Sequence, residues 1–133
     1  MKVRRFGVSL EEDLLEKLDS LAARHRFPNR SQAIRFLVRN ALVEDACDSD
    51  SEVAGVIVMV YDHHRRGVVN RLLSIQHDYS DTIISSQHAH LDHSNCLETI
   101  VVRGRASMLQ DLADRLISVK GIRHGRLMVT GAQ

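Results

Sequence analysis

The first part of the chain changes from an alternating pattern to a helical one. Phe6, Val8 and Leu10 alternate with polar or small residues, which predicts a strand with one buried face. Apolar residues then recur every three or four positions, which predicts a first helix that ends before the turn at Pro28. Ser31 is well placed to begin and cap a second helix with the same spacing.

A single strand followed by two helices is incomplete in one copy. The strand leaves its backbone groups unpaired, and the apolar core of such a short unit is too small to stand alone. Two copies that pair strand to strand would remove both faults. The pattern therefore predicts an N-terminal ribbon-helix-helix domain over 1–45, built as an intertwined dimer.

Beyond an acidic linker over 46–54, the pattern predicts six elements in the order β-α-β-β-α-β. The expected strands are 55–61, 82–91, 96–103 and 122–130, and the expected helices are 67–76 and 107–119. This order is typical of a ferredoxin-like, or ACT-like, domain, which we assign to 55–133. The fold class is α+β.

Charge and composition indicate which partners and which location to expect. Residues 1–42 carry nine Lys and Arg against five Asp and Glu, although the whole chain has a net charge of only +1, so the basic N-terminal end is a candidate for a polyanion partner. The apolar runs are too short to cross a membrane, and no signal-peptide pattern follows the basic N-terminus. We expect a cytoplasmic protein whose two cysteines remain thiols.

The strongest chemical signal is a hairpin that carries two histidines and a cysteine. His88 and His90 lie two residues apart on a predicted strand, so they share a face, and the turn that contains His93 returns the chain to Cys96. With His77 at the end of the preceding helix, these residues predict a transition-metal site. A tetrahedral nitrogen and sulfur set suits zinc, whereas a planar, imidazole-rich set suits Ni(II) or Cu(II).

A second polar cluster, His63-His64-Arg65-Arg66, precedes the third predicted helix. Most such clusters are solvated loops, and the alternatives are a weak second metal site or a phosphate contact. His63 and His93, with Glu98, are candidates for supporting the metal ligands or for holding an ion weakly.

The N-terminal strand supplies the candidate DNA-reading residues. Arg5, Gly7 and Ser9 face away from its apolar side, and a two-stranded ribbon fits the major groove, so these side chains could reach base edges. Arg30 and Ser31, at the start of the second helix, are candidates for a backbone phosphate. The alternative is that the basic residues only solubilise an edge strand.

Four motifs together resemble the nickel-responsive transcriptional regulator (NikR) family: VSLEEDLLEKLDSL, NRSQAIRFLVRNAL, QHAHLDHSNCLE and GIRHGRL. The resemblance implies a tetramer, a dimer of dimers, that binds operator DNA and represses nickel-uptake genes when nickel is plentiful. It implies one square-planar Ni(II) per chain, held by His88, His90 and Cys96 of one subunit and by His77 of a neighbour. It also places Arg65 and Arg66 in a loop that contacts the DNA backbone.

Two departures limit the resemblance. Gly7 and Ser9 stand where some relatives present threonines, so the operator sequence does not carry over. Gln32 and Phe36 stand where some relatives have an acidic pair, so the auxiliary cation site of those relatives does not carry over either.

Other functions remain open from the residues alone. They are a regulator that responds to copper, zinc or cobalt, one that binds a small molecule at the ACT-like interface, and a metal-storing or metal-dependent enzyme. The last is disfavoured because only Glu98 offers a general base beside the hairpin.

Overall fold

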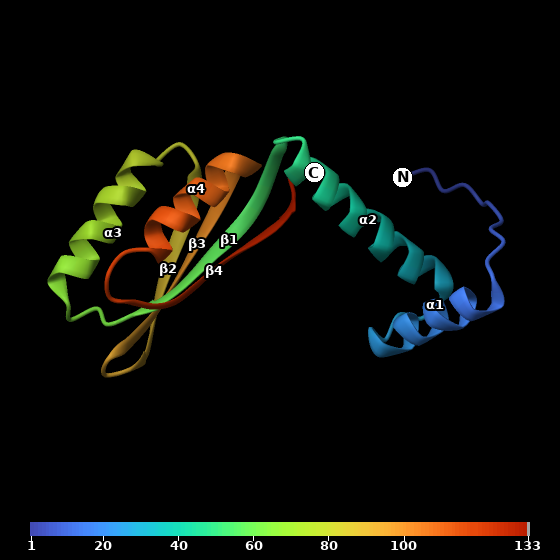
Figure 1. The fold of residues 1–133 in the computed structure, drawn as a ribbon, viewed down its shortest axis with the longest axis horizontal. Helices are drawn as coiled ribbons and strands as arrows, with labels where there is room; N and C mark the ends of the chain where they lie inside the picture. The colour runs from blue at the N-terminus through green and yellow to red at the C-terminus, as the bar shows by residue number, and fades with distance from the viewer. Residues whose placement is uncertain (133) are drawn as a thin grey trace. The chain divides into compact units, whose positions relative to one another are not determined.

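The computed structural model describes residues 1–132 and has an α+β fold, as predicted (Figure 1). The chain divides into two compact units, one formed by Met1–Ala41 and one that begins at Leu42. Among the described residues, none of the helices is both long and apolar enough to cross a membrane.

Two helices form the N-terminal unit, α1 (Glu12–Arg24) and the first part of α2 (Arg30–Asp48). The side-chain oxygen of Asn29 accepts a hydrogen bond from the backbone N–H of Gln32 at 2.9 Å, which satisfies a free donor at the start of α2. The predicted cap was therefore wrong, because Ser31 already lies inside the helix. The turn, the two helices and their order are as predicted.

The segment before α1 belongs to neither a helix nor a strand. A strand is defined by its backbone pairing, and a single chain offers no second copy of this segment to pair with. The predicted ribbon therefore stays a prediction that needs two chains.

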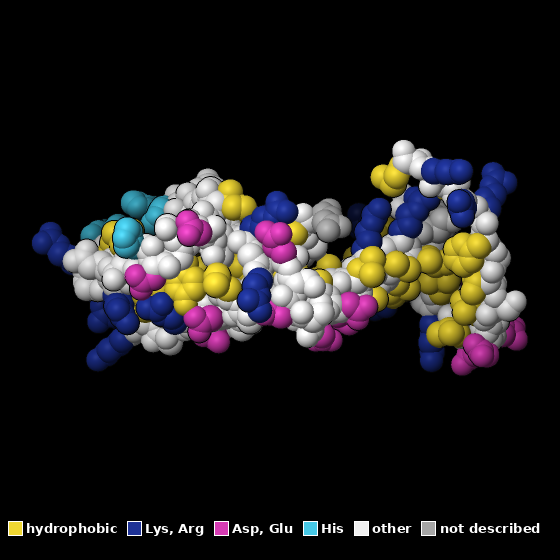
Figure 2. Space-filling model, turned by 90° about the horizontal axis from the view of Figure 1, so that it is seen from above, with side chains coloured by type: hydrophobic (Ala, Val, Ile, Leu, Met, Phe, Trp, Pro, Cys, Tyr) yellow, Lys and Arg dark blue, Asp and Glu magenta, His cyan; other side chains and the backbone are white. Residues whose placement is uncertain are grey.

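An apolar groove crosses the N-terminal unit, where Figure 2 shows hydrophobic side chains gathered. It has a volume of about 370 Å³, and Phe6, Val8 and Leu10 line it together with residues of both helices, which are Leu14, Lys17, Leu18, Leu21, Ile34 and Leu37. Phe6 and Val8 are 76% and 60% exposed. The alternation in the sequence therefore does mark one apolar face, but a single chain does not bury it.

The acidic stretch over 46–54 is more regular than the predicted linker. Helix α2 continues to Asp48, and β1 starts at Glu52, so only 49–51 join the two elements. A single turn ends the helix and leads directly into β1: Ser51 N–H donates to the carbonyl of Ala46, and Asp50 takes a positive φ of 54°.

The C-terminal unit has the predicted β-α-β-β-α-β order. Its elements are β1 (Glu52–Tyr61), α3 (Arg66–Asp78), β2 (Ile83–Asp92), β3 (Asn95–Arg105), α4 (Ala106–Ile117) and β4 (Ile122–Gly131). The strands form one antiparallel sheet in the order β2-β3-β1-β4 (Figure 1). This order sets the end of β1 beside the start of β3, and so beside the β2–β3 hairpin.

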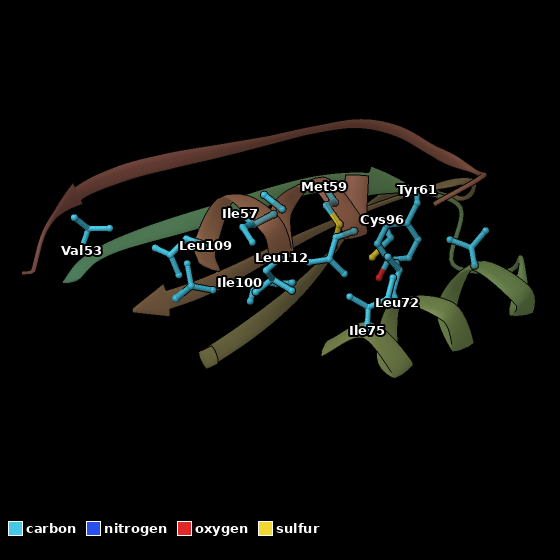
Figure 3. Packing of buried hydrophobic residues seen from close by; sticks show 14 residues of the cluster. Val53, Ile57, Met59, Tyr61, Leu72, Ile75, Cys96, Ile100, Leu109 and Leu112 are labelled. Carbon is cyan, nitrogen blue, oxygen red and sulfur yellow. The ribbon is translucent and has the colours of Figure 1, made fainter. Parts of the chain in front are cut away.

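The core lies on one face of this sheet. Alternate residues of β1 and β3 are buried there against apolar residues of α3 and α4 (Figure 3), a cluster that includes Val53, Ile57, Met59, Leu72, Ile75, Ile100, Leu109 and Leu112. The other face carries Val56 and Val58, which are half-buried, and Val101 and Met128, which are exposed. Helices therefore cover only one face, and an apolar strip remains open on the other.

Candidate metal centre

The β2–β3 hairpin places three of the predicted ligands, His88, His90 and Cys96, on neighbouring strands. His90 stands opposite Cys96 in the strand register, and His88 stands opposite Glu98. The Nδ1 atom of His88 lies 4.0 Å from the sulfur of Cys96. Cys96 and Glu98 are each only 1% exposed, because both point from β3 toward the core.

A buried hydrogen-bond network lies under His88. The hydroxyl of Tyr61 donates to Glu98 Oε1 at 2.6 Å, and the Gln76 side-chain amide donates to Glu98 Oε2 at 3.2 Å. The same Oε2 lies 3.4 Å from His88 Nε2. A carboxylate beside Nε2 favours the proton on that nitrogen, which leaves the lone pair of Nδ1 on the side of Cys96.

His63, which the sequence analysis named as a candidate for supporting the metal ligands, also reaches this centre. The ligand atoms of His63, His90 and Cys96 all lie within 4.8 Å of one another. The rings of His63 and His90 are stacked, with centroids 4.3 Å apart, and the buried Nδ1 of His63 has no hydrogen-bond partner among the described residues. An orphaned imidazole nitrogen beside a thiol and a second imidazole is a fit for a transition-metal ion.

The histidine cluster extends to the surface. The His63 and His64 rings lie 4.0 Å apart, and the His64 and His93 rings lie 4.8 Å apart. Asp62 also accepts hydrogen bonds from the backbone and ring of His64, at 3.0 and 3.1 Å. Histidine side chains are accordingly grouped on one part of the C-terminal unit in Figure 2.

The electrostatics favour the neutral forms of the Cys96 thiol and the His63 imidazole in the absence of a cation. Burial, and next the charge of Glu98, raise the pKa of the Cys96 thiol. Burial, and next the charge of His64, lower the pKa of His63. Burial and the Glu98 hydrogen bond raise the pKa of Tyr61. A bound cation would reverse the balance at Cys96, since metal ligands must lose their protons.

His77 is the predicted ligand that the chain does not bring to this centre. It lies in the last turn of α3 and is exposed. Like His88, it belongs to neither donor group found among residues 1–132, but unlike His88 it has no contact with Cys96 or Glu98 there. An exposed His77 is accessible to a second copy of the chain. The resemblance to the regulator family requires such access, because it assigns His77 to the metal site of a neighbouring subunit.

The candidate DNA contacts are all exposed. Phe6, Val8 and Leu10 line the apolar groove, whereas Arg5, Gly7 and Ser9 do not. Arg30 forms two hydrogen bonds to the carboxylate of Asp19, at 2.8 and 3.0 Å, so a phosphate would have to compete with that exposed pair. Ser31 lies in the first turn of α2, and Arg65 and Arg66 stand at the start of α3.

Comparison with known proteins identifies the family. Residues 54–130 match the model described as "NikR C terminal nickel binding domain", and residues 4–45 match "Ribbon-helix-helix protein, copG family". A protein from Thermococcus kodakarensis named "Putative nickel-responsive regulator" is 50% identical over 132 residues, which cover 98% of this chain and 96% of that protein. The chain belongs to the nickel-responsive regulator family.

A second relative agrees with this membership, and a solved structure shows a similar fold. A second nickel-responsive regulator family protein, from Desulfovibrio desulfuricans, is 51% identical over 121 residues, 91% of this chain and 88% of that one. An uncharacterized protein from Thermotoga maritima has a similar fold, with a TM-score of 0.52, 12% identity, and coverage of 62% of this chain and 100% of the other. Membership of the family marks the chain as a regulator and not an enzyme, as predicted.

Sequence reasoning missed Tyr61 and Gln76, which hold the carboxylate of Glu98. It named His63 as a supporting residue but did not predict that His63 lies beside His90 and Cys96. A signal was present for Tyr61 and His63, because in a sheet of ferredoxin-like order the last residue of β1 pairs near the start of β3, here Tyr61 opposite Cys96. The residues that follow Tyr61 must then lie near the hairpin.

Proposed function

We propose that this regulator is a DNA-binding transcriptional repressor of nickel-uptake genes in the cytoplasm, and that nickel, one ion per chain, promotes its binding to the operator. The observation that carries the proposal is the convergence of His88, His90 and Cys96 on one hairpin, with His90 opposite Cys96 and His88 Nδ1 4.0 Å from the thiol. The same chain carries a ribbon-helix-helix domain.

The donor set supports nickel as the ion. Two imidazoles and a thiolate suit Ni(II), Cu(II) and Zn(II), and the family model that covers this hairpin is described as nickel binding. In the proposal, His77 of another copy supplies the fourth ligand, which fits its exposed position in α3. Glu98 orients His88, and His63 and His93 assist entry or hold an ion weakly.

The apolar groove of the N-terminal unit supports a dimer. A second copy laid across it would bury Phe6 and Val8 and would pair the two extended N-terminal segments as a ribbon. In this arrangement Arg5, Gly7 and Ser9 read base edges in the major groove. Arg30, Ser31, Arg65 and Arg66 contact phosphates, which fix the register without reading sequence.

The open face of the C-terminal sheet supports a tetramer. Val56, Val58, Val101 and Met128 would be buried if two such faces packed together. A metal ion held between copies can favour only the arrangement in which its ligands meet. Such differential binding is what couples the ion to operator binding.

Anaerobic titration of the purified apo-protein with Ni(II), with Zn(II) as competitor, tests the metal site. Absorption bands of thiolate-bound nickel should saturate at one ion per chain, and His88→Ala and Cys96→Ala should abolish tight binding. Cys47→Ala is the matched control, because Cys47 is half-buried in α2 and lies in neither donor group of the described chain. Tight zinc binding without nickel absorption bands would show that zinc, and not nickel, is the ion. Unaltered nickel affinity in both ligand variants would show that His88 and Cys96 are not ligands.

Mixing two defective variants tests whether the site is shared. His77→Ala and Cys96→Ala should each fail to bind nickel tightly, but co-refolded mixtures should recover part of it, because some interfaces would combine an intact His77 with an intact hairpin. No recovery in mixed oligomers would contradict a ligand set that spans two chains.

Gel-shift titration with and without nickel tests the DNA function once an operator fragment is selected from random duplexes. Arg5→Ala should weaken specific binding by about 1–3 kcal/mol. Arg4→Ala is the control, since Arg4 lies on the other side of the alternating segment. Equal losses from both variants would argue against base readout by Arg5.

A further inference from the structure

A basic pocket lies in the C-terminal unit, between the first half of α3 and the turn after α4. Its volume is about 460 Å³, and it is lined by Gly67, Arg71, Arg115, Ser118, Val119 and Lys120. It shares no residue with the two groups of metal donors found in the described chain. The pocket is therefore a separate feature of the sensor unit.

The positive charge in this pocket is largely uncompensated. Arg115 has one carboxylate partner, Asp78, with Nη2 and Oδ2 3.3 Å apart, and its guanidinium stands 5.3 Å from the centre of the Tyr79 ring. Within residues 1–132, Arg71 and Lys120 form no ion pair. Three cations thus share one anionic partner, which favours capture of an anion.

The turn that carries Lys120 is held closely against α3. Gly121 has a φ of +108°, and a Cβ built there would lie 2.6 Å from Cγ2 of Val68, so the position admits only glycine without a shift. The same Cβ would lie 3.5 Å from Nη1 of Arg65, which places a fourth cation at this turn. Packing against α3 therefore fixes the backbone of the turn from which the Lys120 side chain extends.

We propose that this pocket binds a phosphate group. Arg71 and Arg115 offer planar N–H donors, Lys120 offers a compact ammonium, and together they suit an oxyanion that carries more than one negative charge. Gly67 lies in the first turn of α3, which contains no acidic residue to repel such a group. The phosphate belongs either to the DNA backbone, a source that rests on the proposed function, or to a small phosphorylated molecule, which does not.

Calorimetric titration of the full-length protein with pyrophosphate tests the small-molecule source. If that source is right, wild type binds saturably, and Arg71→Gln combined with Lys120→Gln weakens binding at least about tenfold, since each charge-assisted hydrogen bond contributes strongly. Arg103→Gln is the control for loss of a cation outside the pocket, because Arg103 pairs with Glu52 on the sheet and does not line the pocket.

The salt dependence of binding to a long mixed-sequence duplex tests the DNA source. Loss of a phosphate contact lowers the slope of log K against log salt by about one for each contact, so the double variant should show a shallower slope than wild type and Arg103→Gln. A reduced slope without pyrophosphate binding identifies DNA phosphate, and lost pyrophosphate binding with an unchanged slope identifies a small phosphorylated molecule. If the double variant changes neither, the proposal is overturned.

The two arms also separate this proposal from the proposed function. A wild-type protein that binds no DNA at all would contradict the proposed function. The pyrophosphate titration alone would then decide whether the pocket binds phosphate. A protein that binds DNA normally but shows no effect of the double variant in either assay would defeat only the pocket.

Discussion

Glu98 offers the sharpest test of how the metal centre is organised. The residue is 1% exposed and accepts hydrogen bonds from Tyr61 and Gln76, at 2.6 and 3.2 Å. Glu98→Ala would leave both donors without an acceptor, at about 1–3 kcal/mol each, against a typical total stability of about 5–15 kcal/mol. Alanine therefore risks unfolding the protein, and glutamine is the informative change.

Glu98→Gln keeps the volume of the side chain and an oxygen for Tyr61, but it removes the charge 3.4 Å from His88 Nε2. The preference for a proton on Nε2 is then lost, and with it the orientation of the Nδ1 lone pair toward Cys96. Outer-shell changes of this kind typically reduce metal affinity by about 10- to 100-fold, or about 1.4–2.7 kcal/mol. We expect the nickel affinity to fall by this factor. The free energy of unfolding of the apo-protein should fall less than it does in Glu98→Ala.

Competition titration with a chromophoric chelator measures the nickel affinity, and denaturant unfolding of the apo-protein measures its stability. Glu52→Gln is the matched control, because its carboxylate is 60% exposed, pairs with Arg103 and does not contact the histidines. An unchanged nickel affinity in folded Glu98→Gln would refute the orientation argument. A loss equal to that of the Glu52 control would show a general charge effect.

Three further changes test the packing of the C-terminal unit by denaturant unfolding. Leu112→Ala, at a fully buried position of α4, should cost about 2–5 kcal/mol, and a loss below that range would mean that the core refills the cavity. Gly121→Ala should cost more than about 1 kcal/mol because of its positive φ and the contact with Val68, whereas Gly67→Ala, with open space around it, should be neutral or stabilising. The hydrogen bond from the Ser107 backbone N–H lowers the pKa of Asp50, so the stabilisation by Asp50 is present above the unfolded pKa of about 4 and is lost as the pH falls through the lower folded value. Asp50→Ala should therefore reduce the fall in the free energy of unfolding at acid pH. An unchanged acid pH dependence would contradict this role of Asp50.

The sequence predicted the C-terminal unit well because its elements are determined by local patterns. Alternation along β1 and helical spacing along α4 each report a face that this same chain buries. The N-terminal segment shows the same alternation, yet its hydrogen-bonding partner is not within the chain, and no strand forms there. Periodicity identifies an apolar face but does not say which molecule covers it.

Only the part of the metal centre that lies on one hairpin was predictable from the sequence. The pairing of His90 with Cys96 follows from residue spacing and a short turn. The approach of His63 and the burial of Glu98 under Tyr61 depend on β3 lying between β1 and β2, which is a property of the whole sheet. Helix ends were less predictable, since Asn29 and Ser31 are equally good caps by residue type, and only the path of the turn selects Asn29.

The parts of the chain that are proposed to bind nickel, to dimerise and to read DNA are parts that one copy leaves incomplete. The N-terminal segment has no pairing partner, the groove beside it exposes Phe6 and Val8, and one face of the C-terminal sheet carries an open apolar strip. The hairpin offers two imidazoles and a thiol, while His77 lies elsewhere on an exposed helix turn. If one assembly completes all of these, then the ion binds only where the copies have come together, and its binding energy is available to favour that arrangement over others. In that case a variant that weakens the sheet interface, such as Val101→Lys, must weaken nickel and operator binding together, although it touches neither site.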